Sequence, residues 1–511
     1  MRRVGLMCAL LLGPTLLWPT GAQAAWLEAS SAHFVVYADD SEQNLRHFAE
    51  RLERYHAAME LVTRRKTPPV SPSNRLTVYV AKSQDEVLEL AKSDNPRLNG
   101  FYKPRAGASL AVVPPQDSKG NEAERSLRAL LHEYAHHFSI SVSSFPPPLW
   151  LAEGSAEFFA SATFKSRGEV RLGEHAEARI KEVQFASQIT ARDVLDTSDD
   201  SKSGGAYLGF YAKSWLLYHY LVFEPRRQGQ LAQYLAEITA GRNSLDAARN
   251  VFGDLGALDQ ELDEYAGRRK FNYFAVPADA LRPSRVDIRA LTAGAAAITP
   301  VRIRLRVGAD AGQAQELLVQ TRTIARLFPS DPAVLSGLAE AEYIAGNDRE
   351  AVAAADSAIA IDPAQLDAYV QKGLALFRIA GRAADAPAAY ARARAAFEAL
   401  AAREPDHPLP LIYFFRSYLA QGVTPPPLAM ERMQHAVELA PFDLALRLSL
   451  ARQQVRQGQT AAARANLLPV AYDPHDGALA AEARKILASL NTETGAARAG
   501  GGDAGTAKAH R

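Results

Sequence analysis

Residues 126–157 read SLRALLHEYAHHFSISVSSFPPPLWLAEGSAE, and the interpretation of the whole chain starts from this stretch. It contains an H-E-x-x-H motif. Residues four apart share one face of an α-helix, so His132 and His136 can direct two imidazoles at a single metal ion. Glu133 lies beside the first imidazole and can reach a water molecule at that ion. The pattern therefore predicts a metal-binding helix.

A second segment supplies a carboxylate that completes the ligand set. Prolines at 146–148 break the first helix, and a new helix is expected over residues 148–165 because proline is tolerated in a first helical turn. Glu153 follows His136 by seventeen positions, and a turn of that size can fold the second helix back on the first. Two histidines and one glutamate with an open fourth position form a Zn²⁺ arrangement. We therefore expect Zn²⁺ at His132, His136 and Glu153.

Glu157 lies one helical turn after Glu153 and shares its face. Two roles are open for it. It can accept a hydrogen bond from a ligand imidazole and so orient that ring, or it can remain a solvated carboxylate. It is also the rival of Glu153 for the third ligand position.

The chemistry expected of this set is hydrolysis of a peptide bond by an activated water. Glu133 is the candidate general base, which takes a proton from the water and passes it to the leaving amine. A donor must also stabilise the developing oxyanion. Tyr211 is the candidate for that role and Tyr207 is the alternative. The segment 206–223 is apolar nearly all round, so a core aromatic is an equally consistent role for Tyr211.

The H-E-x-x-H motif followed by W-L-x-E-G-x-A at 150–156 resembles the gluzincin clan of zinc metallopeptidases, which includes thermolysin and the large aminopeptidases. The resemblance implies a zincin-like domain in which Glu153 is the third zinc ligand. Residues 210–214 (FYAKS) resemble the clan's Y-x-K-G segment, whose tyrosine stabilises the transition state and maps to Tyr211. The nearest likeness is to bacterial peptidase-MA-like proteins that couple a short zinc domain to tetratricopeptide repeats.

Three departures from the clan's pattern bear on specificity. The interval between His136 and Glu153 is shorter than in the aminopeptidases, and Ser214 stands where the clan usually has glycine. No G-x-M-E-N-type strand precedes the zinc helix, although the aminopeptidases use one to grip a free N-terminus. We therefore expect an endopeptidase, or a peptidase with another specificity, in place of an aminopeptidase.

Composition and the N-terminus restrict the class of protein. The 511 residues carry a net charge of +1, which argues against a dedicated nucleic-acid or membrane-surface binder.

Residues 1–24 are predicted to be a signal peptide, with Arg2 and Arg3 before an apolar stretch and A-Q-A at 22–24, so a periplasmic or secreted product is expected. No later run is long and apolar enough to span a bilayer. The single cysteine, Cys8, lies in the signal peptide, so zinc must be held by histidine and carboxylate.

The peptidase-like domain is predicted to cover residues 25–275, with an α+β lead-in over 25–121 and a mostly helical part with the zinc site over 122–275. Runs rich in β-formers predict the strands of the lead-in. The last of them, at 109–113, comes just before the zinc helix. It can lay out an extended substrate by β-augmentation, or it can simply fill the sheet.

The character of the sequence changes after a predicted linker at 276–309. Helix ends recur at an acidic residue or alanine followed by proline, at residues 331, 362, 404, 440 and 473. The spacings of 31, 42, 36 and 33 residues bracket the period of a tetratricopeptide repeat. We therefore predict tetratricopeptide-like repeats over 310–490 and a disordered tail over 491–511, whose Gly- and Ala-rich sequence has too little apolar surface to form a core.

Together these observations predict an α+β zincin-like metallopeptidase domain followed by an all-α tetratricopeptide-repeat solenoid. The expected function is exported, zinc-dependent hydrolysis of peptide bonds, with repeats that bind a protein partner or the substrate. The alternative is a non-catalytic periplasmic adaptor, in which the repeats carry protein binding and the peptidase domain is vestigial. No nucleic-acid partner is expected.

Overall fold

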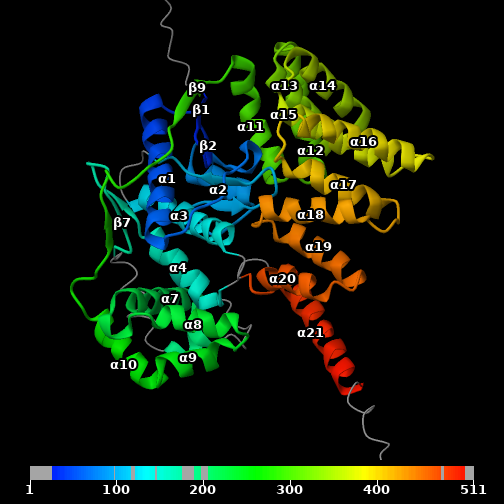
Figure 1. The fold of residues 1–511 in the computed structure, drawn as a ribbon. Coiled ribbons are helices and arrows are strands. Elements are labelled where there is room, and N and C mark those ends of the chain that lie inside the picture. The colour runs from blue at the N-terminus through cyan, green and yellow to red at the C-terminus, as the bar shows by residue number, and fades with distance from the viewer. Residues whose placement is uncertain are drawn as a thin grey trace, which may run out of the picture.

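The fold is known for most of the chain. A computed structural model describes residues 26–96, 98–116, 121–143, 147–174, 189–196, 205–473 and 477–500. The predicted signal peptide and residues 501–511 lie outside these ranges. The described chain is mostly helical, with a small sheet region near its N-terminus (Figure 1). Among the described helices, none has the length and apolar character that crossing a membrane requires.

A six-stranded sheet with the order β4-β5-β3-β2-β1-β9 forms the centre of the N-terminal part. The pairs β2–β3 and β3–β5 are parallel, and the other neighbours are antiparallel. The strands are β1 (Leu27–Ser30), β2 (Phe34–Ala38), β3 (Leu76–Val80), β4 (Phe101–Lys103), β5 (Leu110–Val113) and β9 (Asp287–Ala290). Because β5 is paired on both sides, it fills the sheet and has no free edge on which to lay out a substrate.

Helices cover both faces of this sheet (Figure 1). Adjacent side chains of a strand point to opposite faces, so Val78 is buried on one face and Tyr79 on the other. The face of Val78 packs against α1 and α3, and the face of Tyr79 packs against α2 and α11. These helices are α1 (Glu42–Thr63), α2 (Gln84–Ala91), α3 (Asn121–Val142) and α11 (Ala293–Val307). The helix that carries the H-E-x-x-H motif is α3, and it lies on the sheet.

Further helices and a small sheet complete the N-terminal part. Helices α4 and α7 pack closely against each other, and α3 packs on α4. A three-stranded sheet has the order β6-β7-β8. The elements are η1 (Pro72–Asn74), α4 (Leu149–Ala160), β6 (Thr163–Phe164), β7 (Val170–Leu172), α6 (Ala191–Leu195), α7 (Gly205–Phe223), η2 (Pro225–Arg227), α8 (Gln230–Thr239), α9 (Ser244–Phe252), α10 (Leu255–Ala266) and β8 (Phe274–Val276).

The C-terminal part is a series of packed helices, here called the repeat array, which lies beside the sheet in Figure 1. Two aspartates cap helices of the array: the Asp331 side chain accepts hydrogen bonds from two backbone N–H groups at the start of α13, and the Asp443 side chain accepts one at the start of α19. The array comprises α12 (Ala311–Leu327), α13 (Pro332–Ile344), α14 (Asp348–Ile361), α15 (Leu366–Ala380), α16 (Ala386–Ala401), α17 (Pro408–Ala420), α18 (Pro427–Leu439), α19 (Leu444–Arg456), α20 (Thr460–Ala471) and α21 (Gly477–Gly500).

Two predicted boundaries differ from the structure. The sequence predicts a linker over 276–309, but this stretch contains β9, which pairs with β1, and α11, which joins the sheet to the repeat array. Arg302 and Arg306 of α11 form ion pairs with Glu340 and Asp367 of the array, so this segment is anchored on both sides. The second difference is at the C-terminus, where α21 continues to Gly500 and so includes ten residues of the predicted tail.

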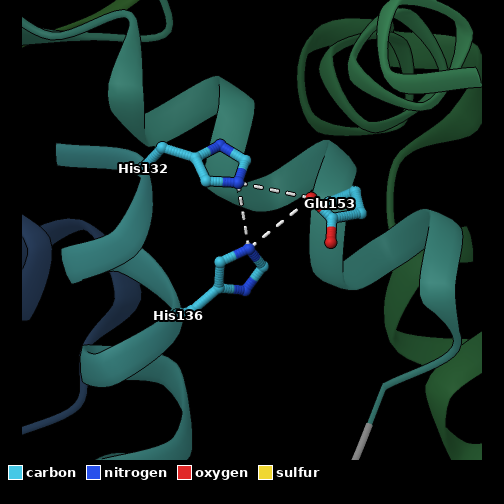
Figure 2. Close-up of side chains that lie close together, drawn as sticks. All are labelled: His132, His136 and Glu153. Carbon is cyan, nitrogen blue, oxygen red and sulfur yellow. Dashed lines mark hydrogen bonds and ion pairs between the residues drawn. The ribbon is translucent and has the colours of Figure 1, made fainter. Parts of the chain in front are cut away.

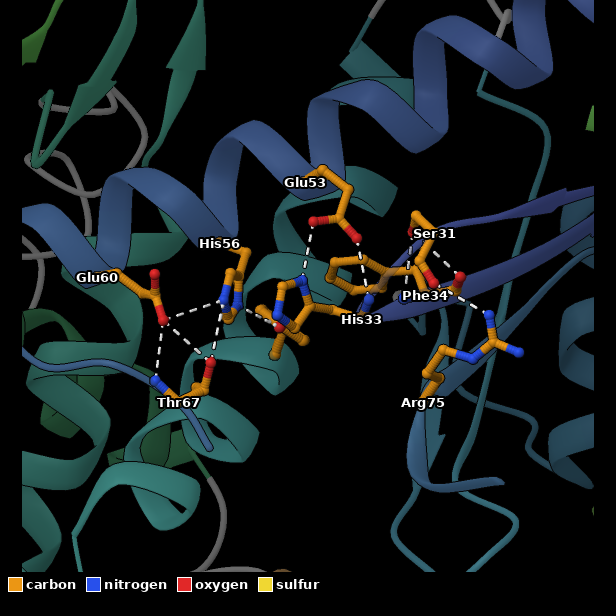
Figure 3. A network of polar contacts seen from close by, with 9 residues as sticks. Ser31, His33, Phe34, Glu53, His56, Glu60, Thr67 and Arg75 are labelled. Carbon is orange, nitrogen blue, oxygen red and sulfur yellow. Dashed lines mark hydrogen bonds and ion pairs between the residues drawn. The ribbon is translucent and has the colours of Figure 1, made fainter. Parts of the chain in front are cut away.

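A buried polar network links α1 to the face of α3 that packs against α1 (Figure 3). The His33 and His56 rings are stacked with centroids 3.6 Å apart, and Nδ1 of His33 lies 2.9 Å from Glu53 Oε2. Nδ1 of His56 lies 2.8 Å from the Tyr134 hydroxyl group, which belongs to the metal-binding helix. Burial, followed by the neighbouring His33, lowers the pKa of His56 to about 4.

This network predicts loss of stability in acid. Below about pH 6.5 the unfolded chain protonates His56, while the folded protein resists protonation until about pH 4, so stability falls as the pH falls through this window. For this residue alone the loss at pH 5 is about 2 kcal/mol. Urea unfolding of the wild type and of His56→Gln at pH 7 and pH 5 measures it. The wild type should lose more stability than the variant, and equal losses would contradict the assignment.

Candidate metal centre

Contacts with α1 fix the position of α3. The Tyr55 hydroxyl group donates to the Leu131 carbonyl oxygen at 3.0 Å, and both side chains are buried. Tyr134 and Phe138 of α3 are also buried in the same core. With one side of α3 packed in this way, His132 and His136 project toward α4 (Figure 2). The helical spacing in the sequence therefore produces a shared direction for the two imidazoles.

The second helix, α4, is held by Trp150 and Gly154. Trp150 is fully buried and its Nε1 donates to the Tyr234 hydroxyl group of α8 at 2.9 Å. At Gly154, an added Cβ would lie 2.4 Å from the Ser214 carbonyl oxygen of α7. Only glycine permits this approach of two helix backbones, which fixes the neighbouring Glu153 in place.

Gly154→Ala is therefore expected to disturb both packing and metal binding. The clash is with backbone, so α4 or α7 must shift, and we expect the free energy of unfolding to fall by about 1–3 kcal/mol. Urea unfolding and zinc content measure the two effects. Gly477→Ala is the matched control, because a Cβ at this exposed helical glycine meets nothing within 4 Å. Equal stability and zinc content for the two variants would contradict the packing argument.

Three donor atoms converge between α3 and α4 (Figure 2). The Nε2 atoms of His132 and His136 are 3.1 Å apart, and Glu153 Oε2 lies 3.3 Å from the first and 3.5 Å from the second. Ligands about 2.0–2.1 Å from a tetrahedral zinc ion are about 3.3–3.4 Å from one another. The three separations match that spacing, so the donor set fits Zn²⁺. Among the described residues, these three form the one cluster of metal-ligand type.

The electrostatics of the cluster favour ion binding. Glu153 is completely buried. Burial alone would raise the pKa of its carboxyl group, but His136 and His132 outweigh burial and hold this pKa far below its ordinary range. Burial alone would lower the pKa of His132, but Glu153 and Glu157 raise it to about 10. A buried carboxylate thus keeps its negative charge and attracts a proton, or equally a metal cation, to the imidazoles.

Glu157 is buried and lies on the far side of the His132 ring. Its Oε1 is 3.4 Å from His132 Nδ1, whereas Glu153 is on the Nε2 side. Glu157 is therefore a buried carboxylate beside the ring and not a solvated one. Glu133 is half-buried, and its negative charge contributes to the raised pKa of Tyr102, for which burial is the larger cause.

Tyr211 lies close to the cluster. It is buried on α7, and its ring centroid is 6.1 Å from that of His132. The structure therefore brings Tyr211 to the cluster. The side chain of Tyr207, the alternative donor, lies outside the described side chains.

Sequence reasoning missed a contact between the zinc helix and the repeat array. Nδ1 of His137 on α3 lies 2.7 Å from the Tyr102 hydroxyl group, and the His137 ring packs on Phe442 with centroids 4.4 Å apart. Asp443 accepts a hydrogen bond from the Ala106 backbone N–H at 3.0 Å. The repeat array is therefore fastened next to the candidate metal centre. No local pattern in the sequence indicates a contact across about three hundred residues.

Comparisons with known proteins place the chain beside a family model and a set of solved structures. Residues 128–246, which include the three clustered residues and Tyr211, match a family described as a protein of unknown function (DUF1570). No curated protein matches the chain.

Solved structures similar to the chain include TPR-repeat proteins. A thermophilic TPR protein of Thermus thermophilus is 19% identical, with 37% of this chain and 97% of that chain covered and a TM-score of 0.32. MamA of Desulfovibrio magneticus is 21% identical, with 40% and 98% covered and a TM-score of 0.27. Yeast Tom70 is 14% identical, with 74% and 76% covered and a TM-score of 0.28. The chain thus pairs a segment matching a family of unknown function with helices similar to those of TPR-repeat proteins.

Proposed function

We propose that this chain is an exported zinc metallopeptidase whose repeat array binds a protein partner or the substrate. The observation that supports the proposal is the triangle of donor atoms from His132, His136 and Glu153, with sides of 3.1, 3.3 and 3.5 Å. Its size suits a tetrahedral ion, and two histidines with one glutamate leave a coordination position open for catalysis.

Zn²⁺ bound there would supply Lewis acidity, which activates water and polarises a peptide carbonyl. The residues of the chain perform the remaining work. Glu133 accepts a proton from the attacking water and passes it to the leaving amine. Tyr211 donates a hydrogen bond to the carbonyl oxygen as negative charge develops on it. Glu157 holds the His132 ring in its orientation.

Zinc-dependent hydrolysis of an unstructured protein tests this proposal. Purified mature protein should contain about one equivalent of zinc by elemental analysis. It should also digest casein, lose that activity with a chelator, and regain it when zinc is added back. Protein that takes up no zinc and leaves casein intact would contradict the proposal.

The second candidate is a non-catalytic periplasmic adaptor, in which the repeats carry protein binding and the zinc-type domain supports them. The specific observation in its favour is the contact of Phe442 with His137, which shows the repeat array and the motif helix built as one unit. The comparisons also fit the adaptor, because they name no peptidase. An intact fold without zinc uptake, unchanged by chelation, would favour this candidate.

A further inference from the structure

A cavity of about 350 Å³ lies next to the candidate metal centre, and His136 is part of its lining. Its walls are largely apolar and come from both parts of the molecule. Helices α3, α4 and α8 contribute Phe138, Leu151 and Leu231, and the repeat array contributes Leu444 and Tyr472. Tyr472 is a large aromatic residue that is 49% exposed. Such a concave, apolar space with few polar groups is typical of a ligand site.

The charged groups of the cavity point to an anion. Besides His136, the cavity is lined by two arginines, Arg447 and Arg65, and one carboxylate, Asp473, so cations outnumber carboxylates by two to one. Arg447 is only 8% exposed, and its Nε donates to the Pro441 carbonyl oxygen at 2.8 Å. In the described part of the chain, no carboxylate forms an ion pair with Arg447. Burial lowers the pKa of this guanidinium group, as expected for a cation that has no anionic neighbour.

We propose that this cavity binds the carboxyl-terminal residue of a peptide, with its apolar side chain against the α3, α4 and α8 walls and its carboxylate on Arg447. The inference rests on the proposed function, because the peptide is the substrate of that site. A guanidinium group pairs with a carboxylate through two parallel hydrogen bonds, and a buried pair of this kind distinguishes an acid from an amide. His136 lines the same cavity, so the bond hydrolysed by water lies near this carboxyl terminus, and a short apolar fragment is released.

The repeat array thereby becomes part of the substrate site. Leu444 and Arg447 are one turn apart on α19, which begins directly after Phe442 and Asp443. Phe442 packs on His137 of the zinc helix, and Asp443 accepts a hydrogen bond from the Ala106 backbone N–H between β4 and β5. The contact that fastens the array therefore also positions Arg447. The specificity of the site would depend on a residue more than three hundred positions from the zinc helix in the sequence.

Binding of three labelled peptides tests the inference. The protein is the full mature chain carrying Glu133→Gln, with chelator present so that no metal can bind the peptide carboxylate. The probes are fluorescein-labelled pentapeptides that end in phenylalanine acid, phenylalanine amide or serine acid, and affinity is measured by fluorescence anisotropy. We expect the phenylalanine acid to bind at least about tenfold more tightly than either of the others. Equal binding of acid and amide would overturn the inference.

Arg447→Gln should abolish the preference for the acid over the amide while leaving amide binding unchanged. Arg452→Gln is the matched control, because Arg452 is an exposed arginine on the same helix that pairs with Glu482. A preference that survives in Arg447→Gln would overturn the assignment. If Arg447→Gln does not fold, the comparison of acid and amide in the parent protein still decides the question.

The binding assay also separates this inference from the proposed function. Acid-selective binding without any hydrolysis by the wild type would refute the peptidase and keep the carboxylate site. Hydrolysis without acid selectivity would keep the peptidase and refute the carboxylate site.

Discussion

Glu133→Gln is expected to lower peptide hydrolysis by about 10²–10⁴-fold while zinc remains bound. The amide keeps the size and shape of the carboxylate but cannot accept a proton from the attacking water. The three donor atoms belong to other residues, so the ligand triangle stays intact. Casein digestion and elemental analysis of the same preparation measure both quantities.

Glu398→Gln is the matched control for this prediction. It makes the same chemical change at an exposed position on α16, and it should leave activity and zinc content unchanged. Hydrolysis retained by Glu133→Gln would exclude the proposed general base. Loss of zinc along with activity would show that Glu133 contributes to metal binding instead.

The candidate site could be predicted because its geometry is local. His132 and His136 are four residues apart, and the periodicity of a helix alone sets their shared direction. Glu153 needed only the assumption that a proline-containing turn folds α4 back on α3. Gly154 was predicted only as part of the W-L-x-E-G-x-A motif. The reason that this position requires glycine is the close approach of the Ser214 carbonyl oxygen of α7, which only the structure shows.

The parts of the fold that sequence reasoning missed depend on long-range pairing. The sequence predicts a linker over 276–309 because β9 is short and three of its four residues are exposed, so it carries no alternating pattern. It becomes a strand only because β1 offers a free edge. The contact of His137 with Phe442 and the contribution of Arg447 to the cavity beside His136 could not be predicted for the same reason, because both depend on long-range contacts. Neither leaves a periodic signal in the sequence, since each brings together residues that are distant in the chain.

Glu153→Gln and Glu157→Gln should separate the ligand from its neighbour. Both remove one buried carboxylate charge from α4, one helical turn apart, but only Glu153 lies within 3.5 Å of both Nε2 atoms. We therefore expect Glu153→Gln to lose nearly all bound zinc. Glu157→Gln should keep it with an affinity about 10–100-fold weaker, as is usual when the partner of a ligand imidazole is removed.

Competition with a chelator of known affinity, followed by elemental analysis, measures both zinc affinities. Zinc should also raise the melting temperature of the wild type and of Glu157→Gln but not that of Glu153→Gln, because an ion that binds only the folded state stabilises it. The reverse result, with zinc lost from Glu157→Gln and kept by Glu153→Gln, would make Glu157 the third ligand. That outcome would require the His132 ring to turn, since Glu157 now faces its Nδ1 atom and the shared space lies at Nε2.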